Sequence, residues 1–338
     1  MRVLGRSEVE RLVQMADAIE LMREVFEHVG HGRAQAPERI GLDVNAGRDS
    51  ILFMPAHLPA SGATGIKIVS VFPENLRSRG VPTINGVVVL NDPDTGEVSA
   101  LMDAGYITAL RTGAVSGLAT DLLARPDARV LAVFGAGVQA RTQIEAVMHV
   151  RRIERVLVHA PTRAHATALV EEVVARYGPR CAAEVAPDAD AALVDADIVV
   201  TATTATTPVF DGERLRSGTH VNAVGSFKPW VRELDDATIR RARVFVDQRS
   251  AALHEAGDLL IPMRAGLMQA DDIAADLGEL VLGSRSGRQG VDEITVFKSV
   301  GLAVEDMIVA QRVLARAEAS GVGLSLPAFA GRQPAPAE

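Results

Sequence analysis

An apolar segment that runs directly into a glycine-rich turn constrains this chain more than any other feature. Residues 129–134 read Arg-Val-Leu-Ala-Val-Phe and are followed by a turn of the form G-x-G-x-x-A. In a dinucleotide-binding turn, Gly135 permits the tight turn, Gly137 lets backbone N–H groups approach a pyrophosphate, and Ala140 lets the next helix pack closely. The alternative is a tight strand-to-helix turn without a ligand. The residues expected to bind phosphate are Gly135, Ala136, Gly137, Val138, Gln139 and Ala140.

The segments around this turn alternate between strand and helix patterns. A helix is expected from about residue 139, and another after residue 159. Alternation of this kind is typical of a doubly wound parallel sheet, so the predicted fold class is α/β. Strands are expected at residues 130–134, 155–159, 198–201, 220–224 and 244–246.

The first third of the chain has a different pattern, in which short apolar runs are broken by Gly, Pro and Asn. Ser7-Glu-Val-Glu10 has the S-x-x-E form of a capping box and predicts a helix start there. The pattern as a whole predicts a mixed sheet flanked by helices. Strands are expected at 51–54, 65–72 and 85–90, helices at 16–29, 106–124 and 300–319, and a disordered tail at 332–338.

The end of the second predicted strand bears on the choice of nicotinamide cofactor. An Asp or Glu at this position would hold the ribose 2′-hydroxyl of NAD. The chain instead reads Val156-Leu-Val-His-Ala-Pro-Thr-Arg163, without an acid. Thr162 and Arg163 suit a 2′-phosphate, so NADP(H) is favoured and NAD(H) is the alternative. The opposing interpretation is that Arg163 is a solvated loop residue.

Length and composition exclude several classes of protein. The 338 residues correspond to about two domains, and 48% apolar with 23% charged residues is ordinary for a soluble globular protein. The net charge of −8 argues against a nucleic-acid partner. The single cysteine, Cys181, cannot form an internal disulfide, and no apolar run reaches the roughly 18 residues of a membrane span. We expect a cytoplasmic protein without a membrane partner, and the histidine spacing predicts no metal site.

The chain resembles the ornithine cyclodeaminase/μ-crystallin family over nearly its whole length. The resemblance implies a Rossmann domain at 122–298, inserted in an α+β domain that binds substrate, mediates dimerisation and comprises 1–121 plus 299–338. The matching segments are Phe53-Met-Pro55, Gly65-Ile-Lys67, Val81-Pro-Thr83, Asp92 to Gly96, Thr108-Ala-Leu-Arg-Thr-Gly113, Ala124-Arg-Pro126, Gly135 to Ala140, Ala223-Val-Gly225, Arg232-Glu-Leu234, Val246-Asp247, Gly257-Asp258 and Thr295-Val-Phe-Lys-Ser299.

The resemblance also implies a substrate site. Arg39, Lys67 and Arg111 would hold a substrate carboxylate facing the nicotinamide, because two arginine forks and an ammonium suit a carboxylate anion. Lys67 and Arg111 would be the catalytic pair, with Lys67 as the proton source. The alternatives are a surface charge for Arg39 and structural roles for the other two. Met54 and Phe227 would also contact the substrate.

Further cofactor contacts are expected after the later Rossmann strands and in the helix that carries Arg111. Thr201-Ala-Thr-Thr204 would line the cofactor, although a simple turn is the alternative. For Lys298 and Ser299 a contact with the cofactor and a purely structural role stay open. The residues of this set are Thr112, Ala202, Thr203, Thr204, Val224, Gly225, Ser226, Lys298 and Ser299.

Two departures from the family pattern bear on the reaction. Its cyclodeaminases carry acids at the positions that correspond here to Leu52 and Phe227, and neither side chain can do acid–base work. The resemblance therefore favours an NAD(P)H-dependent reductase of a cyclic imino acid, such as 1-pyrroline-2-carboxylate or 1-piperideine-2-carboxylate. The alternatives are an alanine-dehydrogenase-like oxidoreductase, an ornithine cyclodeaminase, or a non-catalytic NADPH-binding protein of the μ-crystallin kind.

Overall fold

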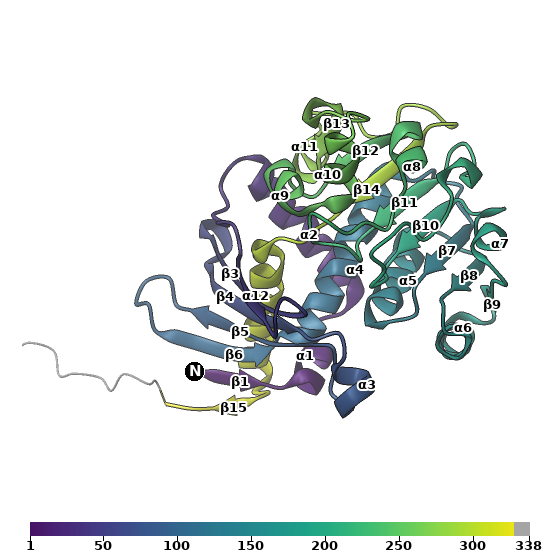
Figure 1. The fold of residues 1–338 in the computed structure, drawn as a ribbon. Helices are drawn as coiled ribbons and strands as arrows, with labels where there is room; N and C mark the ends of the chain where they lie inside the picture. The colour runs from purple at the N-terminus through teal and green to yellow at the C-terminus, as the bar shows by residue number, and fades with distance from the viewer. Residues whose placement is uncertain (328–338) are drawn as a thin grey trace, which may run out of the picture. The chain divides into compact units, whose positions relative to one another are not determined.

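The computed structural model describes residues 1–327, which form two compact units with one sheet each (Figure 1). The first unit comprises Met1–Gln14, Gly32–Thr108 and the chain from Leu302 onward; the second comprises Met15–His31 and Ala109–Gly301. The predicted tail at 332–338 lies outside the described residues. No helix within the described range is long and apolar enough to cross a membrane.

The first unit contains a seven-stranded sheet in the order β15-β1-β6-β5-β4-β3-β2. Strands β2 to β6 each pair antiparallel with the next strand in the sequence. Strand β1 joins β6 in parallel. The strands are β1 (Arg2–Leu4), β2 (Ile40–Val44), β3 (Asp49–Leu58), β4 (Ala63–Val71), β5 (Ile84–Asn91), β6 (Val98–Asp103) and β15 (Leu324–Ser325); the helices are α1 (Arg6–Leu12), η1 (Pro59–Ser61), α3 (Asn75–Arg79) and α12 (Ala303–Ser320).

Helix α12 covers one face of this sheet, packing on β3, β4 and β5 (Figure 1). Successive side chains of a strand point to opposite faces, so every second residue faces the helix. One cross-strand row on this covered face joins Met54, Lys67, Val88 and Met102, all of them buried. A lysine thus stands in the middle of an otherwise apolar layer.

The opposite face of the same sheet is also apolar. Its central row joins Ile40, Phe53, Ile68 and Val87 across β2, β3, β4 and β5. Phe53, Ile68 and Val87 are only half-buried, and Ile40 is 63% exposed. Large apolar side chains in register on an accessible sheet face are typical of an interaction surface.

The predicted capping box at Ser7 is wrong by two residues. Helix α1 begins at Arg6, with Gly5 as its N-cap. The Glu8 carboxylate accepts a hydrogen bond from the Gly5 N–H at 2.6 Å, whereas Glu10 pairs with Arg6 one turn along the helix. Two acids lie near the start of this helix, and it is Glu8, three residues after Gly5, that closes the first turn.

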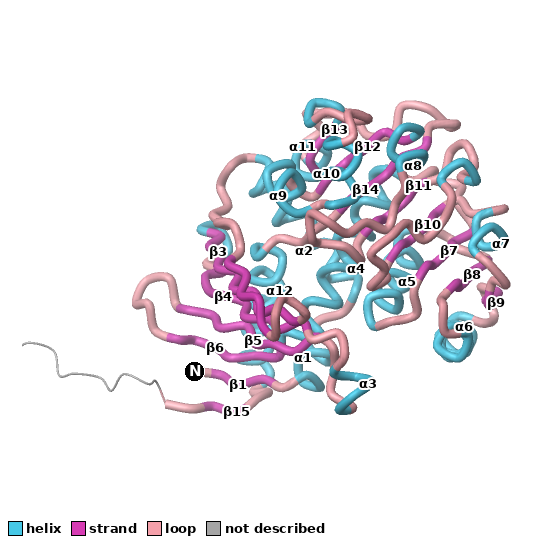
Figure 2. The backbone as a smooth tube through the Cα atoms, in the orientation of Figure 1, coloured by secondary structure: helices cyan, strands magenta, loops and turns pink. Residues whose placement is uncertain are grey.

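The second unit contains an eight-stranded sheet, parallel throughout, in the order β13-β12-β14-β11-β10-β7-β8-β9 (Figure 2). The doubly wound α/β prediction is confirmed. The strands are β7 (Val130–Phe134), β8 (Arg155–His159), β9 (Ala182–Val185), β10 (Ile198–Thr201), β11 (His220–Ala223), β12 (Ala242–Val246), β13 (Ile273–Asp276) and β14 (Ile294–Lys298).

Helices and 3-10 turns connect these strands. Helix α4 begins in the first unit, and its residues from Ala109 onward belong to the second. The helical elements are α2 (Met15–Gly30), α4 (Ala104–Leu123), α5 (Val138–Val150), α6 (Arg163–Tyr177), α7 (Ala189–Leu193), η2 (Gly212–Arg214), α8 (Asp236–Arg241), α9 (Arg249–Glu255), α10 (Gly257–Arg264), η3 (Ala270–Asp272) and α11 (Leu277–Val281).

Helix α2 and the part of α4 from Ala109 onward belong to the second unit, whereas the predicted domains place residues 1–121 with the first sheet. Close backbone contacts explain this grouping. A Cβ at Gly113 of α4 would lie 2.6 Å from the Thr142 carbonyl of α5. A Cβ at Gly30 of α2 would lie 2.8 Å from the Gly278 carbonyl of α11. Glycine at these positions allows the helices to approach at backbone distance.

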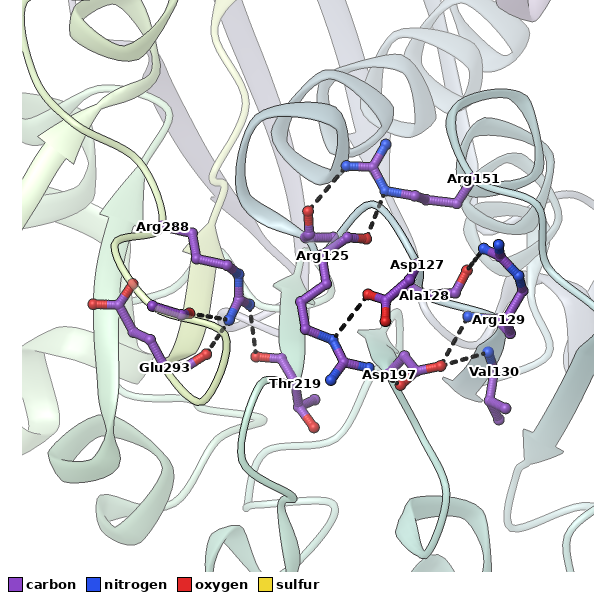
Figure 3. Close-up of polar contacts among 12 residues, drawn as sticks. Arg125, Asp127, Ala128, Arg129, Val130, Arg151, Asp197, Thr219, Arg288 and Glu293 are labelled. Carbon is purple, nitrogen blue, oxygen red and sulfur yellow. Dashed lines mark hydrogen bonds and ion pairs between the residues drawn. The ribbon is translucent and has the colours of Figure 1, made fainter.

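The amino ends of the parallel strands are fastened by charged groups (Figure 3). The Asp197 carboxylate, just before β10, accepts hydrogen bonds from the N–H groups of Arg129 and Val130 and pairs with Arg125 at 2.7 Å. Arg288 donates to the carbonyls of Leu123 and Glu293 nearby. A shallow cavity of about 300 Å³ opens here, lined by Arg125, Pro126, Asp127, Arg288, Gln289, Gly290 and Val291.

His220, the first residue of β11, is fully buried next to this cluster. Its Nδ1 lies 3.0 Å from the Thr295 hydroxyl, and its Nε2 lies 3.2 Å from the Asn222 amide oxygen. Burial, helped by the charge of Arg288, lowers the pKa of His220 from 6.5 to about 3. The native state therefore holds a neutral imidazole that the unfolded chain would protonate below about pH 6.5.

This difference predicts an acid-sensitive stability. With a folded pKa of about 3 against 6.5 unfolded, the contribution of His220 is fully present above pH 6.5 and is lost as the pH falls toward 3. Each pH unit inside that window should cost about 1.4 kcal/mol of unfolding free energy. Urea unfolding at pH 7.5 and pH 5 should show a smaller loss for His220→Gln than for the wild type.

The exposed His165 provides the control. His165→Gln should lose stability between pH 7.5 and pH 5 as the wild type does. Parallel losses in the wild type, His220→Gln and His165→Gln would contradict the assignment of the acid sensitivity to His220.

Candidate active site

The glycine-rich turn lies at the carboxyl end of β7, an interior strand of the parallel sheet. Strand β7 is flanked by β8 on one side and β10 on the other, and the chain reaches β10 only after completing β8 and β9. The connection therefore changes direction between β7 and β10, which makes this place the topological switch point where open parallel sheets bind ligands. Gly135 has φ +108°, and a Cβ there would overlap the Ala202 carbonyl after β10.

The start of α5 fits a phosphate group. Gly137 is the N-cap of this 13-residue helix, whose first turn carries neither a capping side chain nor an acid. A Cβ added at Gly137 would meet nothing within 4 Å, so the backbone here is open to a close approach. Ala140 is fully buried against the strand. Free N–H groups and the helix dipole together attract an anion.

The end of β8, the next strand, carries no carboxylate. His159 ends the strand, and its ring packs edge-on against Phe134 at 5.7 Å between centroids. Thr162 is the N-cap of α6 but makes no side-chain cap hydrogen bond, and both Thr162 and Arg163 are exposed. A hydroxyl and a guanidinium, rather than an acid, therefore follow the end of β8.

A buried carboxylate joins the loops that follow β10 and β11. Glu233 accepts hydrogen bonds from the Thr203 N–H at 2.8 Å, the Thr203 hydroxyl at 2.7 Å, the Thr201 hydroxyl at 2.9 Å and the Gly225 N–H at 2.7 Å. Burial raises the pKa of Glu233, although Lys298 acts in the opposite direction. A Cβ at Gly225 would lie 2.5 Å from the Thr203 carbonyl, so this loop also requires glycine.

A second buried cluster holds Ser226 and Lys298. The Lys298 ammonium lies 2.8 Å from Asp258, 2.6 Å from the Ser226 carbonyl and 2.9 Å from its hydroxyl. Burial alone would raise the pKa of Asp258, but Lys298, Ser226 and the backbone N–H of Leu234 outweigh burial and hold that pKa below its usual value. These contacts are all internal, so a contact of Lys298 with the cofactor stays a prediction.

Lys67 is a charged residue buried in the first unit. Only 1% of its surface is exposed, and its ammonium lies 2.6 Å from the carboxylate of Asp306, which is itself fully buried on α12. Met54 lies directly opposite Lys67 on β3. The apolar strand pattern around Lys67 is confirmed as β4, and the structure adds a carboxylate partner that the sequence interpretation lacked.

The remaining predicted substrate residues lie in both units. In the first unit, Arg39 is half-buried just before β2, and Leu52 is half-buried two residues before Met54 on β3. In the second unit, Phe227 is half-buried and packs against the hydrophobic core behind the loop after β11. The structure brings Met54 and Lys67 together, and Leu52 shares their strand face.

Arg111 and Thr112 lie in the buried part of α4 that belongs to the second unit. Arg111 is 6% exposed, and its guanidinium lies against the backbone of Gly301. The Thr112 carbonyl accepts a hydrogen bond from Gln143 of α5 at 3.0 Å. Arg111 is thus buried, and its role in binding a substrate carboxylate stays a prediction.

Four buried acids in these clusters were missed by the sequence interpretation, and one of them is Asp258 beside Lys298. Asp306 pairs with Lys67, Glu233 ties two loops together, and Asp247 accepts hydrogen bonds from the segment after β14. Glu233 and Asp247 lie inside segments that carry the family resemblance, which is a usable signal. For Asp306 the only signal is its position among apolar residues of the final helix. Asp235 caps α8, and its carboxylate accepts a hydrogen bond from the Thr238 N–H.

The all-parallel sheet and the turn at its switch point define a dinucleotide-binding fold of the Rossmann type. The model of the ornithine cyclodeaminase/mu-crystallin family matches residues 1–321, and the chain belongs to that family. It is 43% identical over 324 residues to a Delta(1)-pyrroline-2-carboxylate reductase of Bacillus cereus, covering 96% of this chain and 98% of that protein.

Two solved structures have a similar backbone. One is Delta(1)-pyrroline-2-carboxylate reductase of Thermococcus litoralis in complex with NADH and L-proline, with a TM-score of 0.94, 41% identity, and coverage of 96% of this chain and 100% of that one. The other is an archaeal alanine dehydrogenase dimer with bound NAD, with a TM-score of 0.91, 35% identity, and coverage of 97% and 99%.

The Lys67–Asp306 pair generates a stability prediction. Asp306→Asn leaves a buried ammonium without its counter-charge and should lower the unfolding free energy by about 3–5 kcal/mol. Replacing both partners, as in Lys67→Met with Asp306→Leu, should recover most of that loss, because no charge then remains buried. Urea unfolding of the single and double variants measures both effects.

The exposed pair Arg6–Glu10 is the matched control. Glu10→Gln should change the unfolding free energy by less than about 1 kcal/mol, because solvent screens this pair. An Asp306→Asn variant as stable as Glu10→Gln would show that the buried pair does not carry the predicted energy.

Proposed function

We propose that this chain is an NAD(P)H-dependent reductase of cyclic imino acids such as 1-pyrroline-2-carboxylate and 1-piperideine-2-carboxylate. The observation that carries the proposal is the likeness along nearly the whole chain, at 43% identity and at a TM-score of 0.94, to two proteins named for this activity. One of those structures holds NADH and L-proline, a reduced cofactor and a cyclic amino acid.

The nicotinamide dinucleotide would lie along the carboxyl edge of the parallel sheet. The open backbone at Gly137 and the uncapped start of α5 suit its pyrophosphate. When bound, the reduced cofactor supplies a hydride to the imine carbon, and a proton is added to the imine nitrogen. The residues proposed to contact the cofactor are Thr112, Gly135, Ala136, Gly137, Val138, Gln139, Ala140, Thr162, Arg163, Ala202, Thr203, Thr204, Val224, Gly225, Ser226, Lys298 and Ser299.

The substrate carboxylate would be held by Arg39, Lys67 and Arg111. A guanidinium binds a carboxylate through two parallel N–H groups, and fixing the carboxylate orients the ring for hydride transfer. Lys67 is the proposed proton donor to the imine nitrogen. Asp306 at 2.6 Å stabilises the lysine's charge in a layer that is otherwise apolar.

The apolar side chains favour imine reduction over cyclodeamination. Leu52 and Phe227 occupy the two positions at which the resemblance places acids in the cyclodeaminases, and neither side chain can transfer a proton. Reduction of a cyclic imine needs one proton donor and an oriented carboxylate, whereas cyclodeamination also needs a base for the loss of ammonia and ring closure. Met54 and Phe227 would contact the carbon ring.

The second candidate is a reductive amination of an open-chain keto acid with ammonia. The archaeal alanine dehydrogenase, at a TM-score of 0.91 and 35% identity, supports this candidate. Both reactions pass hydride to a C=N carbon beside a carboxylate, so the same anchors would serve. The two differ in whether ammonia is consumed.

We infer that the protein assembles as a homodimer through the accessible face of the first unit's sheet. The apolar row from Ile40 to Val87 and the neighbouring Ile66 and Val89 leave that face half-exposed in a single chain. Burying apolar surface of this extent favours association. The archaeal alanine dehydrogenase of similar backbone is itself a dimer.

The first test follows NADPH and NADH absorbance with 1-pyrroline-2-carboxylate and its six-membered homologue. The wild type should oxidise the cofactor without added ammonia. Lys67→Met should lower kcat/KM by at least about 30-fold, the cost of removing one member of a desolvated charge pair. Arg111→Lys keeps the charge but removes the two parallel N–H groups of the guanidinium, so it should lower kcat/KM by about tenfold or more. Quenching of Trp230, the single tryptophan, by NADPH would verify that both variants still bind cofactor.

Oxidation that requires ammonia and pyruvate would establish the second candidate instead. Ammonia release from ornithine without net change of the cofactor would establish a cyclodeaminase. Cofactor binding without turnover of any of these compounds would indicate a non-catalytic NADPH-binding protein.

The cofactor preference has its own test. If Arg163 pairs with a 2′-phosphate, Arg163→Ala should raise KM for NADPH by about tenfold and leave KM for NADH within about twofold. The control is Arg152, which is 82% exposed and precedes the amino end of β8, whereas Arg163 follows its carboxyl end. Equal effects on both cofactors, or equal effects of Arg163→Ala and Arg152→Ala, would refute the preference for NADP(H).

A further inference from the structure

The guanidinium of Arg111 occupies the space beside one particular glycine. Gly301 has φ +80°, a conformation that favours glycine, and it is the last residue of the second unit. A Cβ built on Gly301 would overlap Nη1 of Arg111 and lie 3.0 Å from Nη2. The backbone at Gly301 therefore forms one wall of the space that holds this guanidinium.

A buried carboxylate fixes that wall. Oδ2 of Asp247, which follows β12, accepts hydrogen bonds from the N–H groups of Val300 at 2.7 Å and Gly301 at 2.8 Å, and from the Ser299 hydroxyl at 2.9 Å. Its Oδ1 accepts the N–H of Gln248 at 2.8 Å. Asp247 is fully buried, so the carboxylate is directed at the protein's own backbone and not at solvent.

We propose that Asp247 is a positioning residue that, through the Ser299–Gly301 turn, fixes the guanidinium of Arg111 in the orientation that binds the substrate carboxylate. This inference rests on the proposed function, because it assigns Arg111 to a carboxylate. Three hydrogen bonds to one oxygen hold the turn in its left-handed conformation, and the missing side chain at Gly301 leaves room for the guanidinium. Asp247 acts through this turn, because both of its carboxylate oxygens accept hydrogen bonds from the protein itself.

Two substitutions perturb this arrangement in different ways. Gly301→Ala puts a methyl group into the space of the guanidinium while leaving Asp247 in place. Asp247→Asn keeps the size of the side chain but removes its charge, which weakens the hydrogen bonds that hold the turn. Gly266→Ala is the matched control, because Gly266 also has a positive φ, +72°, and a Cβ there would meet nothing within 4 Å.

The experiment compares two substrates that share a C=N bond. 1-Pyrroline-2-carboxylate carries the carboxylate, and 1-pyrroline lacks it. Gly301→Ala, Asp247→Asn and the reference variant Arg111→Lys should each lower the ratio of kcat/KM for the first to kcat/KM for the second by about tenfold or more, with kcat/KM for 1-pyrroline itself changed less than about threefold. Gly266→Ala should leave the ratio unchanged. Equal losses on both substrates in Gly301→Ala and Asp247→Asn would overturn the proposal.

A second measurement does not depend on activity. Crystal structures of the wild type, Gly301→Ala and Asp247→Asn should show the Arg111 guanidinium displaced or disordered in both variants, and an unchanged guanidinium would also overturn the proposal. If the wild type reduces neither imine, the proposed function fails, and these structures still decide whether Asp247 positions Arg111. Binding of NADPH, followed by Trp230 quenching, should stay within about twofold in Gly301→Ala and Gly266→Ala, which leave Asp247 and its hydrogen bond to Ser299 in place.

Discussion

Buried carboxylates that accept backbone N–H groups are the interaction on which the candidate site depends. A parallel sheet brings the ends of its strands to one edge but leaves the loops beyond them without a partner strand. Glu233 holds the loops after β10 and β11, Asp258 holds Ser226 and Lys298, and Asp247 holds the turn after β14. Each acid exchanges its hydration for several donors, which is the condition under which a buried charge is tolerated.

These acids make the edge rigid in a way that side-chain packing alone would not. A hydrogen bond to a backbone N–H fixes the peptide plane, and therefore fixes which N–H and carbonyl groups remain for a ligand. Two glycines contribute to the same rigidity. Gly135 next to Ala202 and Gly225 next to Thr203 allow neighbouring loops to come into backbone contact. We infer that the edge is largely formed before any ligand binds, which lowers the entropic cost of binding.

In the first unit the buried charge is an ammonium, which lies in an apolar layer. Lys67 has Asp306 as its counter-charge, from a helix that follows it by more than two hundred residues in the chain. An unpaired ammonium in that layer would lose its proton or destabilise the fold. The pair keeps a positive charge available where the proposed reaction needs both an anchor for a carboxylate and a proton.

The local features of this protein were accessible from its sequence, and the long-range ones were not. The strand before Gly135, the turn itself and the missing acid at the end of β8 are encoded by adjacent residues, and the structure has them where the pattern predicts. The strand that carries Lys67 was predicted from its apolar neighbours, but the partner Asp306 was not, because no short-range pattern links β4 to α12. The cap of α1 was misassigned because Glu8 and Glu10 both lie near the helix start. The wall at Gly301 depends on a positive φ and on the hydrogen bonds that Asp247 accepts from this turn. Neither the backbone angle nor this long-range contact can be read from the sequence.

The central claim is that hydride passes from the nicotinamide to the carbon of a cyclic imine that carries a carboxylate. Incubation with 1-pyrroline-2-carboxylate and NADPH or NADH deuterated at C4 on either face tests it most directly, with mass spectrometry and NMR of the product. The account predicts proline with one deuterium at the α-carbon, from one of the two cofactor faces. Proline without deuterium from either face, or no proline at all, would contradict it.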